Sequence, residues 1–197
     1  MWSLELSTAP TLEPLTLDEV RDQLNIDTSA QDGLLDAIRV AARGEIESRL
    51  SKALLTSTWK LRLGGWPSTG EIRLPRPPLV SVSSIAYIDT NGASQTLAAS
   101  QYTVDKYVEP GRIVPAYGVS WPSLRAVPAN VTVTYIAGWP APGSIPREIL
   151  QAMLLTIGHL YEQRETHIVG TIVEELPTVT RLLASHRCYY EFREECG

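Results

Sequence analysis

The sequence predicts an α+β protein, in which an antiparallel β domain is inserted between the second and third helices of a small bundle of about four helices. Three observations lead to this prediction. Apolar residues recur at helical spacing near both ends of the 197-residue chain. In the middle of the chain the spacing changes to the alternation that half-buried strands show. Most of the 14 prolines also lie in this middle part, where they break helices and favour turns.

The first helix is predicted to begin at a capping box. Thr16 and Glu19 are three residues apart, so each side chain can accept a hydrogen bond from the backbone N–H of the other. Helical apolar spacing then continues to a predicted end near Asn25. A longer stripe predicts a second helix over residues 30–51. Its apolar members are Leu34, Leu35, Ile38, Ala41, Ala42, Ile46 and Leu50.

Strands are predicted from Trp59 onward, where apolar residues alternate with Lys60 and Arg62. The segment Asp89-Thr-Asn-Gly92 predicts a hairpin with a type I′ turn, because Asn-Gly tolerates positive φ values. About six hairpin-linked strands are consistent with either a sandwich or a small barrel. The strands are expected near 59–63, 72–74, 80–88 with a bulge at Ser83-Ser84, 102–104, 113–114 and 131–137.

Helical spacing returns near the C-terminus. Pro146 suits a first helical turn, and the apolar band from Ile149 to Tyr161 predicts a helix over 146–164. Pro177 is expected to begin a short final helix, after a loop over 165–176. The predicted parts are therefore an N-terminal helical part (1–58), a β domain (59–140), a C-terminal helical part (141–187) and a tail (188–197).

Charge is distributed unevenly among these parts. The chain has a net charge of −5, made up of −5 over residues 1–58, +3 over 59–140 and −3 over 141–197. Because the chain is acidic, we do not expect its main function to be the binding of nucleic acid through the phosphates. No apolar run reaches the roughly 18 residues of a membrane helix, and the N-terminus lacks a signal peptide, so we expect no membrane association.

The sequence contains no recognisable catalytic or phosphate-binding motif, neither GxSxG nor a glycine-rich phosphate loop. The few histidines and cysteines are more consistent with ordinary surface or packed residues than with a metal centre or a nucleophile. We therefore expect no enzyme activity, no cofactor and no metal. The residues considered are His159, Glu162, Glu165 and His167 for a metal, and His186, Cys188 and Cys196 for a nucleophile.

The β domain combines tryptophans with scattered arginines. Such residues can stack on and clamp a nucleic acid strand, and a nucleic-acid-binding module remains the alternative interpretation. The same residue types are enriched at protein–protein contacts, and the chain has five Trp and eight Tyr but one Phe. We therefore favour contacts with other subunits or protein partners. The predicted contact residues are Trp66, Arg76, Arg112, Trp121 and Trp139.

The order of these motifs resembles the head–tail connector (adaptor) proteins of long-tailed bacteriophages, prophages and gene transfer agents. The resemblance runs from about Pro14 to Arg187. It rests on PLTLDEVRDQLNID (14–27), DGLLDAIRVAARGEIESRLSKALLTSTWKLRL (32–63), GWPSTGEIRLPRPPLVSVSSIAYIDTNG (65–92), YTVDKYVEPGRIVPAYGVSWP (102–122), VTVTYIAGW (131–139), IPREILQAMLLTIGHLYEQRE (145–165) and LPTVTRLLASHR (176–187).

This resemblance implies a structural protein of the virion neck, made in the host cytoplasm. Family members assemble as a ring, usually a dodecamer, beneath the portal protein. The ring extends the DNA channel, through which genomic DNA passes without sequence-specific binding, and it docks tail-completion or stopper proteins. The C-terminal segment is expected to reach toward the portal. On this chain the expected portal contacts are Tyr189, Tyr190, Phe192 and Arg193.

Overall fold

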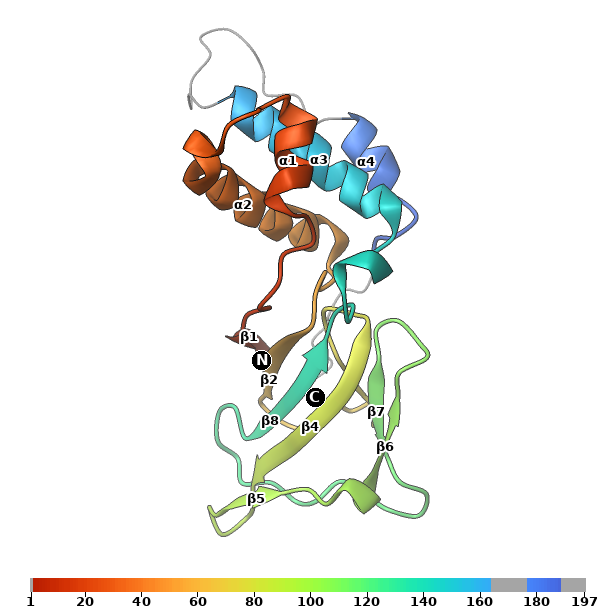
Figure 1. The fold of residues 1–197 in the computed structure, drawn as a ribbon. Helices are drawn as coiled ribbons and strands as arrows, with labels where there is room; N and C mark the ends of the chain where they lie inside the picture. Colours follow the sequence, from red (N-terminus) through yellow and green to blue (C-terminus); the bar gives the residue numbers. More distant parts are fainter. Residues whose placement is uncertain (1, 164–176, 189–197) are drawn as a thin grey trace, which may run out of the picture. The chain divides into compact units, whose positions relative to one another are not determined.

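The computed structural model describes residues 2–163 and 177–188, which form two compact units (Figure 1). The β unit comprises residues 2–10, Thr56–Gly138 and Cys188. The helical unit comprises Thr11–Leu55 together with residues 139–163 and 177–187. The β strands from 57 to 137 lie between the second and third α-helices, so the predicted α+β class with an inserted β segment is confirmed.

Four α-helices build the helical unit: α1 (Leu17–Leu24), α2 (Asp32–Leu50), α3 (Arg147–Glu162) and α4 (Pro177–Leu183). The predicted capping box begins α1, since the Thr16 hydroxyl accepts from the Glu19 N–H at 3.2 Å and the Glu19 carboxylate accepts from the Thr16 N–H at 2.7 Å. Asn25 ends the helix in the left-handed conformation. Short 3₁₀ helices η1 (Ser29–Gln31) and η3 (Pro142–Ser144) precede α2 and α3.

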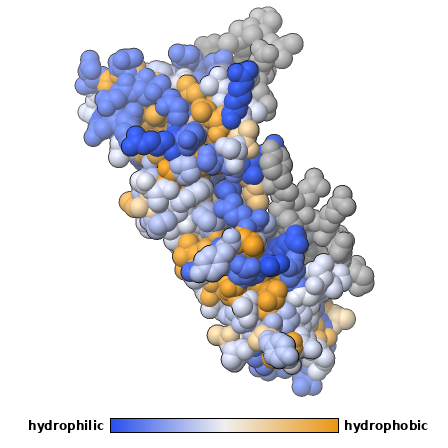
Figure 2. Space-filling view, turned by 90° about the vertical axis from the view of Figure 1, so that its right-hand side faces the viewer, coloured by the Kyte–Doolittle hydropathy of each residue, from blue (hydrophilic) through white to orange (hydrophobic). Residues whose placement is uncertain are grey.

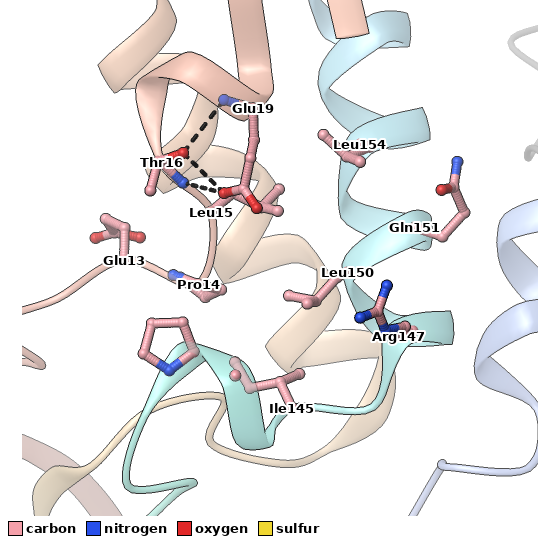
Figure 3. A pocket seen from close by; sticks show the side chains of 12 residues that line it. Glu13, Pro14, Leu15, Thr16, Glu19, Ile145, Arg147, Leu150, Gln151 and Leu154 are labelled. Carbon is pink, nitrogen blue, oxygen red and sulfur yellow. Dashed lines mark hydrogen bonds between the residues drawn. The ribbon is translucent and has the colours of Figure 1, made fainter. Parts of the chain in front are cut away.

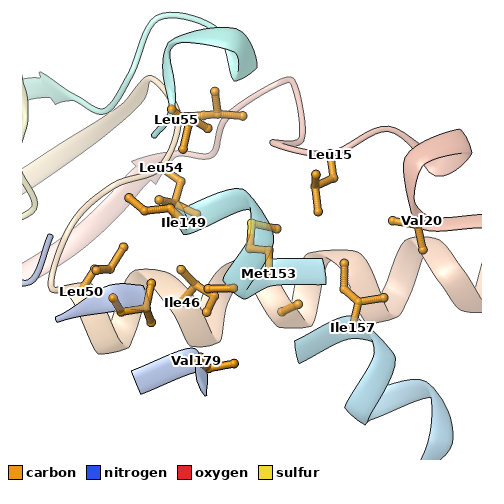
Figure 4. Packing of buried hydrophobic residues seen from close by; sticks show 14 of the residues in the cluster. Leu15, Val20, Ile46, Leu50, Leu54, Leu55, Ile149, Met153, Ile157 and Val179 are labelled. Carbon is orange, nitrogen blue, oxygen red and sulfur yellow. The ribbon is translucent and has the colours of Figure 1, made fainter. Parts of the chain in front are cut away.

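The apolar stripes of these helices meet in one core (Figure 4). On α2 the buried residues fall at helical spacing, and those of α3 face them. The short helices α1 and α4 each add buried side chains, so all four α-helices contribute to the core. The fully or nearly fully buried members are Leu15, Val20, Leu35, Ala42, Ile46, Leu50, Leu54, Leu55, Ile145, Ile149, Ala152, Met153, Ile157, Val179 and Leu183.

Two antiparallel sheets build the β unit. The larger has the strand order β1 (Trp2–Thr8), β2 (Ser57–Leu63), β8 (Val131–Ala137), β4 (Leu79–Ile88), β5 (Ser94–Thr96). The smaller has the order β3 (Ile72–Arg73), β7 (Arg112–Pro115), β6 (Tyr102–Asp105), with the 3₁₀ helix η2 (Ala99–Gln101) before β6. The unit is therefore made of two sheets and not of one closed barrel.

One face of the larger sheet forms the core of the β unit. Residues at alternate positions of β2 and β8 are buried, and they pair across the strands, as Leu61 does with Val133. Tyr135, which is fully buried, donates its hydroxyl to the carbonyl of Pro75 at 2.8 Å. Because Pro75 follows β3 closely, this hydrogen bond ties the larger sheet to the segment that leads out of the smaller one.

Residues 2–8 correct the expected N-terminal helical part. They form β1, which pairs with β2 in the register Trp2↔Leu63, Leu4↔Leu61 and Leu6↔Trp59. The segment WSLELST has the period of two that defines a strand, with apolar residues at 2, 4 and 6. The strand therefore belongs to the β unit, although it precedes the first helix in the chain.

The hairpin between β4 and β5 also differs in detail from the prediction. Positive φ occurs at Gly92 (86°) and not at Asn91, so the turn is not type I′. The Asp89 carboxylate accepts from the backbone N–H groups of Asn91 and Ala93, both at 2.9 Å, and its carbonyl accepts from the Gly92 N–H at 2.9 Å. These hydrogen bonds stabilise a turn in which Gly92 alone is in the left-handed region. The predicted bulge is present, with a register shift between Val82 and Ser84.

Candidate functional site

Trp66 and Trp121, two of the predicted contact residues, pack against each other within the β unit. Their ring centroids lie 4.5 Å apart and their planes differ by 10°, which is a stacked arrangement. Trp66 donates its indole N–H to the carbonyl of Pro122 at 2.7 Å, and Trp121 donates to that of Gly70 at 3.1 Å. The pair therefore fixes two loops of the β unit to each other.

Arg112 lies in a network of charged side chains. It donates to Glu71 at 3.1 Å and to Asp105 at 3.2 Å, and Arg73 donates to the other carboxylate oxygen of Glu71 at 2.5 Å. Burial acts to raise the pKa of Glu71, but the hydrogen bonds from both arginines outweigh it and hold the pKa below its ordinary value. These arginines are engaged by carboxylates, which weakens the interpretation of the β unit as a nucleic-acid clamp.

Arg76 and Trp139 lie apart from these groups. The Arg76 guanidinium carbon is 5.5 Å from the ring centroid of Trp59, a cation–π distance. Trp139 belongs to the helical unit, where it packs against the core and has the Lys52 ammonium 5.9 Å from its ring. Of the five predicted contact residues, the structure brings only Trp66 and Trp121 together.

The residues predicted to contact the portal, Tyr189, Tyr190, Phe192 and Arg193, lie outside the described residues. So do Glu165, His167 and Cys196. Within residues 2–163 and 177–188, no three His, Cys, Asp or Glu side chains are grouped as metal ligands would be. His186 lies 3.7 Å from Glu148, and Cys188 is a half-buried free thiol.

Two tyrosines that were not singled out from the sequence stand exposed on the β unit. Tyr107 is 90% exposed and Tyr117 is fully exposed, and each is followed closely by an exposed valine, Val108 or Val119. They flank the smaller sheet, Tyr107 in the loop between β6 and β7 and Tyr117 just after β7. In the sequence, the surplus of Tyr over Phe indicates that some tyrosines lie at a surface that is buried on association, but composition alone does not show which tyrosines are exposed.

A pocket of about 450 Å³ opens on the helical unit between the start of α1 and the start of α3 (Figure 3). Leu15, Ile145, Leu150 and Leu154 provide its apolar wall. Its carboxylates are already engaged: Glu13 accepts from Arg43 at 2.9 Å, and Glu19 belongs to the capping box. The pocket therefore combines an apolar wall with carboxylates that are already bound within the helical unit.

The arginines near α1 and α2 are paired with acids of the same unit. Asp22 and Asp27, in contrast, are exposed and have no ion pair within the described part of the chain, so the surface around α1 keeps a negative charge. The pairs are Arg21 with Asp18 and Asp32, Arg39 with Asp36, Arg43 with Glu13 and Glu47, and Arg49 with Glu45.

These observations define a class of protein. No helix among residues 2–163 and 177–188 is long and apolar enough to cross a membrane. Arg73 and Arg112 are bound by carboxylates, while the large aromatic side chains of Tyr107 and Tyr117 are exposed on the β unit. Such a surface is suited to association with other protein chains. The surface of the β unit therefore fits the class of structural proteins that associate with other protein chains.

Comparisons with known proteins agree with this class. Residues 14–110 match the model of the family described as phage gp6-like head–tail connector proteins. A chain from the neck of an empty gene transfer agent particle, computed with C6 symmetry, is 25% identical with a TM-score of 0.79, and the match covers 96% of this chain and 97% of that one. A search of curated protein sequences gives no match.

Two further solved structures share the fold. A chain from the virion of a native gene transfer agent particle is 24% identical with a TM-score of 0.77, over 95% of this chain and 96% of that one. A chain from the neck of the native particle, computed with C12 symmetry, is 24% identical with a TM-score of 0.74, over 96% and 97%. The chain is a head–tail connector protein of the kind found in phages and gene transfer agents. This family is a class of structural proteins and not a class of enzymes.

Proposed function

We propose that this chain forms a homo-oligomeric ring in the neck of a phage or phage-like particle. The ring would lie beneath the portal protein, extend the DNA channel and provide a surface to which tail-completion proteins dock. One observation carries this proposal: the likeness to the neck chain of a gene transfer agent particle extends over 96% of this chain, with a TM-score of 0.79. The whole fold is matched, including the β unit, so the proposal concerns both units.

The charge of the helical unit supports the role of a conduit. A channel that holds a duplex tightly would slow its passage, whereas an acidic wall repels the phosphates and lets the DNA slide. The arginines near α1 and α2 are held by carboxylates, and Asp22 and Asp27 leave the α1 surface acidic. We propose that this acidic surface faces the DNA.

The β unit supports the docking role. Its exposed tyrosines and valines are the kind of side chains that become buried when proteins associate. Trp66, Arg76, Arg112, Trp121 and Trp139 remain proposed contact residues, although the structure already gives each of them contacts within the chain. The tail residues Tyr189, Tyr190, Phe192 and Arg193 remain proposed contacts with the portal.

The proposal is tested by assembling the full-length chain with its portal protein and imaging the product by electron microscopy. Rings of one size on the portal are expected, and the variant lacking residues 188–197 should stay folded and lose attachment. A gel-shift titration of the chain alone with duplex DNA should show no tight, steeply salt-dependent binding. Particles that acquire tails in cells lacking this chain would refute the proposed function.

A further inference from the structure

The side of α2 that points away from the core carries no charge. At about 100° per residue, its members fall within roughly 120° of the helix circumference, opposite the buried Leu35, Ala42 and Ile46. All of them are exposed, whereas a surface helix normally turns charged and polar residues to the solvent. This outer face of α2 consists of Gly33, Leu34, Ala37, Val40, Ala41, Gly44 and Ser48.

The outer face of α2 has the properties of a helix face that is buried on association. Leu34 is 41% and Val40 is 40% exposed. A Cβ atom added at Gly33 or Gly44 would meet no described atom within 4 Å, so another helix can approach closely there. Charged residues are also depleted at the centres of protein interfaces. Those that flank this face pair along the helix, as Asp36 with Arg39, Arg43 with Glu47 and Arg49 with Glu45.

The helical unit has a second apolar surface at the pocket between the starts of α1 and α3. Leu150 and Leu154 line the pocket from α3 (Figure 3), and Leu12, in the segment that leads into it, is 57% exposed. We call the pocket lining together with Leu12 the pocket surface. Leu150 is turned by about 100° from Ile149, which packs in the core toward α2. The pocket surface and the outer face of α2 therefore lie on different sides of the unit.

We propose that the outer face of α2 of one subunit packs on the pocket surface of the neighbouring copy in the ring, with Leu34 entering the pocket. This inference rests on the proposed ring. A closed ring needs two different surfaces on each subunit, and the helical unit supplies both. An apolar cavity of about 150 Å³ can hold a benzene molecule, so a pocket of about 450 Å³ has room for a leucine side chain.

The charges beside the two surfaces are complementary. Arg147, which lines the pocket, is exposed and has no ion pair within the described part of the chain. Asp36, half a turn after Leu34 on α2, keeps 53% of its side chain exposed although it pairs with Arg39. Leu34 in the pocket would bring Asp36 toward Arg147 of the neighbouring copy, which favours this pairing of surfaces. The outer face of α2 offers no cation to a DNA phosphate.

A second copy accounts for both surfaces at once. Among the described residues of the helical unit, the most exposed large apolar side chains are Leu12, Leu34 and Val40, and all three belong to these two surfaces. Figure 2 shows apolar side chains at the surface of this unit, among charged ones. Unrelated partners would have to cover the two surfaces separately, whereas in a ring each copy covers one surface of its neighbour and has its own covered in turn.

Crosslinking tests this arrangement on the ring assembled on its portal. In a background with Cys188→Ser and Cys196→Ser, one preparation carries Ala37→Cys on α2 and another carries Gln151→Cys in the pocket lining. A short bifunctional maleimide should give crosslinked dimers in mixed rings and none in either preparation alone. Thr180→Cys at an exposed position of α4 replaces Gln151→Cys as the matched control, and it should not crosslink to Ala37→Cys. Rings without the mixed crosslink, or with Ala37→Cys crosslinked to a second Ala37→Cys subunit or to the portal, would overturn the interface but not the ring.

Gly44→Leu separates assembly from folding. It should raise the Tm of the single chain by roughly 2–4 °C, because leucine favours a helix over glycine and the space beside Gly44 is open. In the ring the same side chain would occupy the space of the neighbouring copy. The protein concentration needed to half-saturate the portal should therefore rise by at least about tenfold, whereas Thr180→Leu, the matched control on α4, should leave it unchanged.

Each other outcome has a defined meaning. A lower Tm for Gly44→Leu would show that the chain itself covers the outer face of α2, and unchanged assembly would show that no neighbour packs on it. Either result would overturn the interface and leave the ring in place. Failure of the wild-type chain to form any ring would refute the proposed function, and the interface with it.

Discussion

Gly111 gives the sharpest test of packing in the β unit. A Cβ atom at this position would lie 2.6 Å from Cδ2 and 2.7 Å from Cβ of Leu79, whereas carbon atoms in contact are normally 3.5–4.0 Å apart. The Leu79 Cβ cannot swing away, because β4 is held in register there by pairing with Ala137. Gly111 is held as well, since its carbonyl accepts from the Leu74 N–H at 2.8 Å. Gly111→Ala must therefore move one strand relative to another.

Overpacking of this kind costs about 1–3 kcal/mol, which corresponds to a decrease in Tm of roughly 2–12 °C for a chain of this length. Urea unfolding followed by tryptophan fluorescence measures it well, because Trp2, Trp59, Trp66 and Trp121 all lie in the β unit. Gly65→Ala is the matched control, since a Cβ there meets no atom within 4 Å, and its cost should stay below about 0.5 kcal/mol. Equal stability of the two variants would show that the contact between Gly111 and β4 is wrong.

Three further predictions concern named contacts. Thr16→Ala removes the capping hydroxyl of α1 and should lower the free energy of unfolding by about 1 kcal/mol, while Glu19→Gln, which keeps an acceptor, should lower it less. Thermal unfolding followed by circular dichroism measures both variants, and a larger loss for Glu19→Gln would contradict the prediction. Tyr135→Phe leaves a carbonyl in the β unit without its donor and should cost about 1–2 kcal/mol in urea unfolding, and an unchanged midpoint would exclude this hydrogen bond. Glu71 has a folded pKa below its ordinary value near 4.5, so the stabilisation by its ion pairs is present at neutral pH and is lost as the pH falls through the folded pKa. The wild type should therefore be more stable than Glu71→Gln at pH 7, and this difference in stability should disappear in acid. A difference that stays constant with pH would rule out the ion pairs as its cause.

The helices were predictable from the sequence because their signals are local. The capping box at Thr16 and the apolar stripe of α2 each lie within a few turns of one helix, and the structure places both as predicted. β8 was equally clear, since its alternation reflects one buried face. The smaller sheet was harder to predict as a separate sheet, because strand order depends on which distant segments pair and no local pattern records that choice.

β1 shows why a visible pattern can still be misassigned. The alternation at Trp2, Leu4 and Leu6 is present in the sequence, but the strand pairs with residues fifty or more positions later, beyond the helices α1 and α2. Chain order favours grouping it with the nearest element, which is helical. The turn at Asn91 and Gly92 was also predicted incorrectly from a local pattern. Its conformation depends on the hydrogen bonds accepted by the Asp89 carboxylate, and the Asn-Gly dipeptide alone does not determine it.

The aromatic residues show what composition can and cannot decide about an interface. Trp and Tyr were treated alike in the sequence, because both combine a large apolar surface with a polar end. The structure separates them: Trp66 and Trp121 satisfy their N–H groups on backbone carbonyls and stack together, whereas Tyr107 and Tyr117 project into solvent. An indole N–H can only donate, so a nearby carbonyl in the same chain fulfils its need completely. The phenol hydroxyl of tyrosine both donates and accepts hydrogen bonds. It can therefore bind water while the side chain is exposed and bind a polar group of another chain after assembly. It follows that loss of Tyr107 or Tyr117 should weaken assembly without weakening the fold, whereas loss of Trp66 or Trp121 should weaken the fold as well.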